Sequence, residues 1–252
     1  PNLARGSEFL APRAEKCRVV PFGLPVRRLT ATPAVEARAA ELRAAHTGRK
    51  IVLFVGRLVY YKGVDILVRA MASVDADLVL IGRGPLEEEI AELTAANGVA
   101  GRLTSLPPQH DEELSAWYRA ADVFCLPSVA RSEAFGLVQI EAHAAGTPVV
   151  STDLPTGVPF ANLDGVTGLI APPGDVAALA AALTRLLEDD QLRARLGAQA
   201  QARAVREFTV QRMVAGTLDV YAEAIERHAG PDRGGSGRSP NAGRRPQAPR
   251  GV

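Results

Sequence analysis

Two glutamates with seven residues between them mark the stretch SEAFGLVQIEAHAAGTPVV, residues 132–150. Glu133 comes just before an apolar, helix-like run, and Glu141 lies inside that run. Carboxylates accept hydrogen bonds, so two acids facing a crevice can hold the row of hydroxyl groups that a sugar and a ribose offer. On a helix starting near Phe135 the two acids point to roughly the same side, too far apart to share a proton. The spacing therefore predicts hydroxyl recognition, and a solvent-exposed helix face is the alternative.

The start of the same helix and one loop upstream could bind phosphate. Gly136 and Leu137 would present free backbone N–H groups, which favour anions at a helix N-terminus. The loop GRLVYYKG contains Gly56, Arg57 and Lys62. Glycine lets the backbone approach a ligand closely, and two cations can hold a diphosphate through charge-assisted hydrogen bonds. A polar turn without a ligand is the alternative interpretation of this loop taken alone.

The segment IGRGPLEEEI only partly resembles a dinucleotide-binding fingerprint. After Gly82 and Gly84, Glu87 occupies the third glycine position, and no Gly-Lys-Ser/Thr follows. These features argue against an NAD enzyme and against a P-loop. What remains is a tight turn at Arg83, leading into a helix whose N-terminus faces an anion.

Histidines and cysteines predict no metal site. His110 is expected in solvent, and His143 either hydrogen-bonds in the site or packs in the core. No group of His, Cys, Asp and Glu has the spacing of metal ligands. Cys17 and Cys125 are expected to be reduced thiols.

Apolar runs alternate with helix-like segments along the chain. Strands are predicted at residues 51–55, 77–81, 122–126, 148–152 and 168–171, with a weaker candidate near Leu103. Helices are predicted at residues 64–73, 86–97, 111–121, 135–145, 175–187, 191–206 and 210–228, with Asp175 as an N-cap. This order is typical of an α/β fold with a parallel sheet covered on both sides. In such sheets ligands bind beyond the carboxyl ends of the strands, where the polar, glycine-bearing loops of this chain fall.

Composition limits the functional classes. With 252 residues and a net charge of +1, the chain has no basic excess for gripping nucleic acid or a membrane surface. No run approaches the roughly 20 apolar residues that span a bilayer. The chain begins without methionine, so we expect a fragment, and the Gly-, Pro- and Arg-rich residues 229–252 are expected to be disordered.

Three ordered motifs, GRLVYYKG, SEAFGLVQIEAHAAGTPVV and DGVTGLIAPPGD, together resemble the C-terminal, donor-binding half of family 4 retaining glycosyltransferases with the GT-B fold. The two glutamates match that family's E-x7-E element, and the resemblance runs from about Arg18 to His228. It implies a Rossmann-like three-layer domain with the N-terminal half of the fold missing. Residues 1–22 would be a remnant of the acceptor domain and crossover, and residues 23–228 the nucleotide-sugar domain with its C-terminal helices.

The resemblance also implies roles for individual residues. Arg57 and Lys62 would bind the donor diphosphate, near Gly56, and stabilise it as it leaves. Gly136 and Leu137 would bind phosphate through the backbone. Glu133 would hold the donor sugar, Glu141 the ribose, and the backbone near Arg83 the base. The donor would be a UDP- or GDP-linked sugar, used with retention and with no metal or other cofactor.

The segment PTGVPFANLDG departs from the family pattern, because no glutamate follows Thr156 and Gly157 at the usual place. The larger departure is the missing first domain, which would bind a sugar or lipid-linked acceptor. We therefore expect the chain alone to bind donor with little or no turnover, in the cytoplasm, with peripheral membrane association allowed. The last helix, which normally packs on the missing domain, is expected to expose apolar surface. A truncated nucleotide-sugar-binding module and a sugar-nucleotide epimerase are the alternatives; base, sugar, acceptor and oligomeric state stay open.

Overall fold

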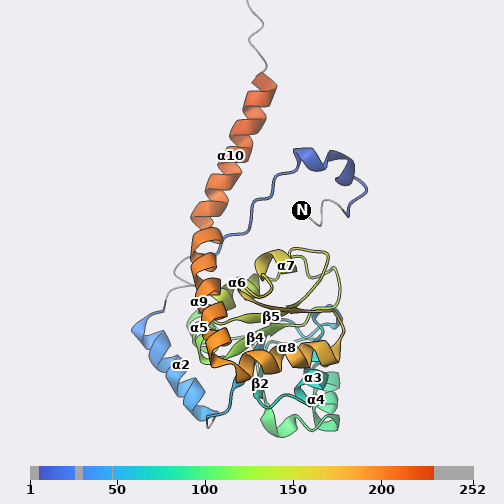
Figure 1. The fold of residues 1–252 in the computed structure, drawn as a ribbon, viewed down its shortest axis with the longest axis vertical. Helices are drawn as coiled ribbons and strands as arrows, with labels where there is room; N and C mark the ends of the chain where they lie inside the picture. Colours follow the sequence, from blue (N-terminus) through green and yellow to red (C-terminus); the bar gives the residue numbers. More distant parts are fainter. Residues whose placement is uncertain (1–5, 26–30, 47, 230–252) are drawn as a thin grey trace, which may run out of the picture.

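The computed structural model describes residues 6–25, 31–46 and 48–229, and is built on one six-stranded parallel sheet (Figure 1). The strands are β1 (Ile51–Val55), β2 (Asp77–Ile81), β3 (Leu103–Leu106), β4 (Val123–Leu126), β5 (Val149–Thr152) and β6 (Gly168–Ala171). Their order is β3-β2-β1-β4-β5-β6, and every neighbouring pair is parallel. The predicted α/β fold class is therefore confirmed, including the weaker strand near Leu103.

Side chains along the central strands alternate between two cores. In β1, Val52 and Phe54 join one apolar cluster, whereas Ile51, Leu53 and Val55 join the other. A period of two is what a pleated strand imposes, and both faces are apolar because helices cover both. This double burial explains the continuous apolar runs in the sequence.

Helices pack on both faces of the sheet. On one face α3 (Val64–Met71), α4 (Glu87–Ala96) and α8 (Val176–Glu188) contribute side chains to the core. The opposite core takes side chains from α2 (Pro33–Ala45), α5 (Asp111–Ala120) and α6 (Leu137–Ala144). The described chain also contains short helices η1 (Ala11–Lys16), η3 (Tyr60–Lys62), η4 (Ala100–Arg102) and α7 (Val158–Ala161), and longer helices α9 (Asp190–Glu207) and α10 (Val210–Ala229).

The seven predicted helices are present, and the Asp175 side chain caps α8 by accepting from the Ala178 amide. Helix α2 was not predicted, because its buried stripe is thin and consists of Val35, Ala39 and Leu42. Helix α6 begins at Leu137, two residues later than expected.

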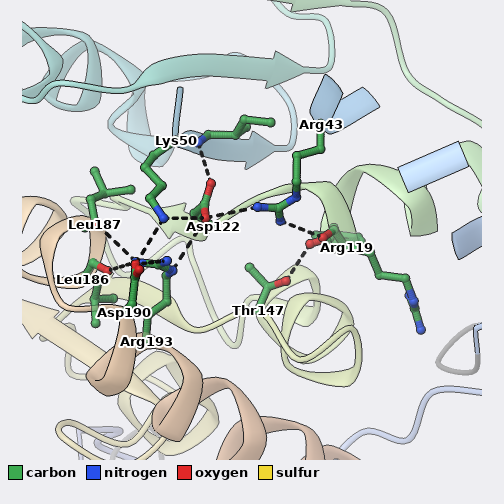
Figure 2. A network of polar contacts seen from close by, with 11 residues as sticks. Arg43, Lys50, Arg119, Asp122, Thr147, Leu186, Leu187, Asp190 and Arg193 are labelled. Carbon is green, nitrogen blue, oxygen red and sulfur yellow. Dashed lines mark hydrogen bonds and ion pairs between the residues drawn. The ribbon is translucent and has the colours of Figure 1, made fainter. Parts of the chain in front are cut away.

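A buried carboxylate joins several elements at the amino ends of the strands (Figure 2). Asp122, just before β4, accepts from the Ile51 amide at 2.9 Å. Its other oxygen lies 3.3 Å from Arg43, 3.7 Å from Lys50 and 3.6 Å from Arg193. The Asp122 side chain is only 4% exposed, so these cations compensate a charge withdrawn from water.

Helix α10 rises away from the sheet (Figure 1). Its exposed side chains are Val214, Leu218, Tyr221 and Ile225. This confirms the expectation that the last helix exposes apolar surface. The segment before residue 26 approaches the base of this helix, where Leu24 pairs with Thr209.

Within the described ranges no helix is both long and apolar enough to cross a membrane. The tail expected to be disordered, apart from Ala229 at the end of α10, lies outside the described residues.

Candidate functional site

The predicted site residues meet at the carboxyl ends of the strands, where the strand order changes direction between β1 and β4. Strands β2 and β3 extend from one side of this pair and β5 and β6 from the other. Open α/β sheets bind ligands at such a switch point, because the loops leave the two strands in opposite directions. The expected convergence of polar loops on one edge is thus confirmed.

Glycines let these loops touch backbone to backbone. A Cβ on Gly82 would lie 1.9 Å from the Gly56 carbonyl oxygen, and one on Gly63 would lie 2.2 Å from that of Pro127. Gly63 also has φ of +65°, which disfavours other residues. Side chains at these positions would push the loops apart and open the edge of the sheet.

The loops after β1 and β4 hold a buried ion pair. Lys62 Nζ lies 2.5 Å from Glu133 Oε2, although the residues are 71 positions apart in sequence. Ser128 Oγ donates to the same oxygen at 3.0 Å. The side chains of Lys62 and Glu133 are only 12% and 9% exposed. Sequence reasoning identified the acid and the lysine but missed Ser128, whose only signal is its place in the same loop as Glu133.

Beside this pair is an open, mostly apolar pocket of about 350 Å³. Its lining comprises Val55, Gly56, Arg57, Ile81, Gly82, Arg83, Pro108, Gln109 and Leu114. Predicted residues Gly56, Arg57 and Arg83 are therefore brought together at its wall. Pro108 and Gln109 were missed because the loop after β3 carries no glycine or charge to mark it, and Leu114 was missed as an apolar residue of α5.

Arg83 is anchored by the turn that begins α4. Its guanidinium lies 2.6 Å from Glu87 Oε2, and the Gly84 amide donates to Glu87 Oε1 at 2.9 Å. The Gly84 hydrogen bond and, secondarily, Arg83 lower the pKa of Glu87. Glu87, which broke the dinucleotide fingerprint, is thus used to hold this turn.

Glu141 lies in a second, smaller hollow of about 40 Å³ on the surface of α5. The buried Tyr118 hydroxyl donates to Glu141 Oε2 at 2.8 Å. Burial, and secondarily the charge of Glu141, raises the pKa of Tyr118 well above its ordinary value, so the phenol keeps its proton. The hollow is lined by Asp111, Leu114, Ser115, Tyr118 and Glu141, and Leu114 also lines the first pocket. Sequence reasoning missed Tyr118; the signal is polar residues at i, i+4 and i+7 along one face of α5.

The sequence predicted that the two glutamates point to roughly the same side, but in the structure they have different partners. Glu133 lies four residues before α6 and is held by Lys62 and Ser128, whereas Glu141 is inside α6 and bonded to Tyr118. Helical periodicity therefore does not relate them, and each occupies a separate part of the edge.

The start of α6 has the form expected of an anion site. Gly136 precedes the helix with φ of +73°, and Leu137, its first residue, is 40% exposed. An added Cβ on Gly136 would lie 2.6 Å from Leu126 Cδ2, so glycine is needed on steric grounds too. The unpaired amides of the first turn carry partial positive charge.

His143 and Cys125 are core residues. Both are fully buried, and burial, with Arg203 nearby, lowers the pKa of His143 to about 3. Burial also raises the pKa of the Cys125 thiol. His110 is exposed, as expected. Among the residues that the structure describes, no three His, Cys, Asp or Glu side chains are grouped to hold a metal ion.

Residues 38–203 match the family described as glycosyl transferases group 1. The chain is 41% identical to a D-inositol 3-phosphate glycosyltransferase of Nocardia farcinica, over 91% of this chain and 53% of that protein. Among solved structures, sucrose-phosphate synthase of Thermosynechococcus elongatus superposes with a TM-score of 0.74 at 31% identity, covering 83% of this chain and 53% of that one. Anabaena HepE in complex with UDP-glucose gives 0.70 at 25% identity, covering 81% and 56%. The chain therefore spans about half the length of the relatives it matches.

Proposed function

Because this chain belongs to the glycosyl transferases group 1 family, we propose that it forms the donor-binding half of a retaining glycosyltransferase. The observation that carries the proposal is the ion pair between Lys62 and Glu133 at the switch point, with a pocket of about 350 Å³ at the same edge of the sheet. The split into residues 1–22, 23–228 and 229–252 is part of the same proposal.

The donor would lie across the edge of the sheet in a defined order. The base enters the apolar pocket beside Arg83, and the ribose reaches Glu141 past Leu114, which lines both hollows. The diphosphate meets Arg57, Lys62 and the amides at Gly136 and Leu137, and the sugar meets Glu133. The base thus meets an apolar surface, the ribose and the sugar each meet a carboxylate, and the diphosphate meets cations.

The reaction would transfer the sugar to an acceptor hydroxyl with retention at the anomeric carbon. A donor phosphate oxygen helps to deprotonate the acceptor, and the leaving diphosphate gains negative charge. Arg57 and Lys62 stabilise that charge where it develops, and no metal is assigned to this role.

The acceptor would bind to a part of the protein beyond this chain. HepE was solved with UDP-glucose, and the Nocardia relative is named a D-inositol 3-phosphate glycosyltransferase. We propose a UDP- or GDP-linked donor, a role in building a polysaccharide or glycolipid, and a cytoplasmic location that allows contact with a membrane face. The chain alone should bind donor with little turnover.

Calorimetric titration with UDP, GDP and ADP, with and without magnesium, tests the donor site. We expect saturable binding of one nucleotide, independent of magnesium and weakened in Arg57→Ala. Lack of binding to all three would contradict the proposal. Binding with no transfer when the other half of the protein is supplied would instead identify a nucleotide-sugar-binding module.

Tyr118→Phe should weaken recognition of the ribose specifically. Without the phenol, the Glu141 carboxylate loses a hydrogen bond that orients it, and it meets the ribose hydroxyls less well. The preference for the ribonucleotide over its 2′,3′-dideoxy analogue should fall roughly threefold to tenfold, for a hydrogen bond contributing about 0.5–1.5 kcal/mol. An unchanged preference, with the melting temperature retained, would show that Tyr118 serves packing alone. Tyr60→Phe, at an exposed tyrosine, is the matched control.

A further inference from the structure

Lys62 has two competing partners if the chain binds a nucleotide diphosphate as proposed. In the structure its ammonium lies 2.5 Å from Glu133 Oε2, and little solvent reaches either side chain. A diphosphate at the same edge offers the ammonium another anion. Because both anions repel each other, the carboxylate of Glu133 opposes the ligand that Lys62 would attract.

Two hydrogen bonds hold the backbones of the loops that carry Lys62 and Glu133. The Val129 amide donates to the Tyr61 carbonyl at 2.9 Å, which joins the loop after β4 to the loop after β1. The Thr152 hydroxyl donates to the Ser128 carbonyl at 2.5 Å, which joins the loop after β4 to the end of β5. With the backbones held in this way, the exchange of partners falls to the side chains of Lys62 and Glu133.

A sugar on the diphosphate lowers the cost of moving Lys62 from Glu133 to the phosphate. Its hydroxyl groups can donate to Glu133 and replace the hydrogen bond that Lys62 withdraws when it turns to phosphate. A bare nucleoside diphosphate has no such hydroxyls at this position. Among the described side chains, Ser128 then remains to donate to Glu133 Oε2, and a buried carboxylate with too few donors is costly.

We infer that Glu133 is a specificity-determining residue that disfavours the bare nucleotide relative to the sugar nucleotide, through its ion pair with Lys62. The inference rests on the proposed function. In the donor complex, the sugar hydroxyls donate to Glu133. After the sugar is transferred, Lys62 pairs with Glu133 again, and the product nucleotide is bound more weakly. The same pair thus favours donor entry and product release.

Glu133→Gln separates the two ligands. It keeps the shape and removes the charge, so Lys62 becomes available to phosphate. In calorimetry, UDP should bind roughly tenfold tighter than to the wild-type chain, because binding no longer breaks one charged hydrogen bond, whereas UDP-glucose should not gain. The GDP and GDP-mannose pair replaces these probes if the chain prefers guanine. Glu133→Asp, which draws the carboxylate back from Lys62, should tighten UDP less and provides a second variant if Glu133→Gln fails to fold.

Glu141→Gln is the matched control, since it removes a carboxylate from the same edge without touching Lys62; it should weaken both ligands alike. Equal or weaker UDP binding by Glu133→Gln and Glu133→Asp would overturn the inference while leaving the donor site standing. Absence of nucleotide binding by the wild-type chain would overturn both the donor site and the inference.

Discussion

Replacing Asp122 with alanine should lower the free energy of unfolding by roughly 3 kcal/mol. The carboxylate is almost fully buried and holds Arg43, Lys50 and Arg193 together with the Ile51 amide (Figure 2). Removing one partner of a buried charge cluster leaves the other charges uncompensated, which costs about 3–5 kcal/mol. We expect the lower end, because the side chains of Arg43 and Lys50 are 48% and 36% exposed and water can partly replace the lost anion.

Urea unfolding followed by circular dichroism measures this loss. Asp190→Ala is the matched control: Asp190 also pairs with Lys50 and Arg193 but its side chain is 75% exposed, so little change is expected. The stability loss of Asp122→Asn should lie between those of Asp122→Ala and Asp190→Ala, because the amide oxygen can still accept from Ile51 but carries no charge. If Asp122→Ala and Asp190→Ala lowered the free energy of unfolding equally, the burial of Asp122 would not explain its contribution to stability.

Lys62→Ala should reduce the affinity for the nucleoside diphosphate by roughly tenfold to hundredfold. A hydrogen bond to a charged group contributes about 1.5–3 kcal/mol, and each 1.4 kcal/mol is tenfold in affinity. The loss should lie near the lower figure, because Lys62 of the wild-type chain must leave Glu133 before it meets the diphosphate, and the variant has no such ion pair to break. The Glu133 carboxylate of the variant still repels the diphosphate, with no ammonium to bind it.

Calorimetry with UDP and uridine distinguishes a lost diphosphate contact from a general disturbance of the site. Uridine has no diphosphate and should bind equally to the wild-type chain and to Lys62→Ala. Combining Lys62→Ala with Glu133→Gln should recover part of the lost affinity by removing the repulsion. Lys50→Ala, at the opposite ends of the strands, should leave both ligands unaffected. If Lys62→Ala weakened uridine as much as UDP, the contact with the diphosphate would be contradicted.

Local sequence carried most of the information on the fold. The apolar runs of β1, β2, β4, β5 and β6 are continuous because helices cover both sheet faces, so composition and length sufficed to find them. Helix α2 escaped because only three of its side chains are buried, and a thin apolar stripe looks like an exposed segment. Glycines at positions 56, 63, 82 and 136 were visible in sequence, but the carbonyls and side chains they approach were not.

By itself the sequence determined the alternation of strands and helices, the polar loops at the strand ends and the types of residue available for phosphate and hydroxyl groups. Only the tertiary structure decided which of them act on each other. The strand order places β1 beside β4, and this brings Lys62 within 2.5 Å of Glu133 across 71 positions of chain. The register of α5 against α6 likewise pairs Tyr118 with Glu141. Such pairings depend on how separate elements pack, and local sequence patterns do not determine the distances between segments that are far apart in the chain.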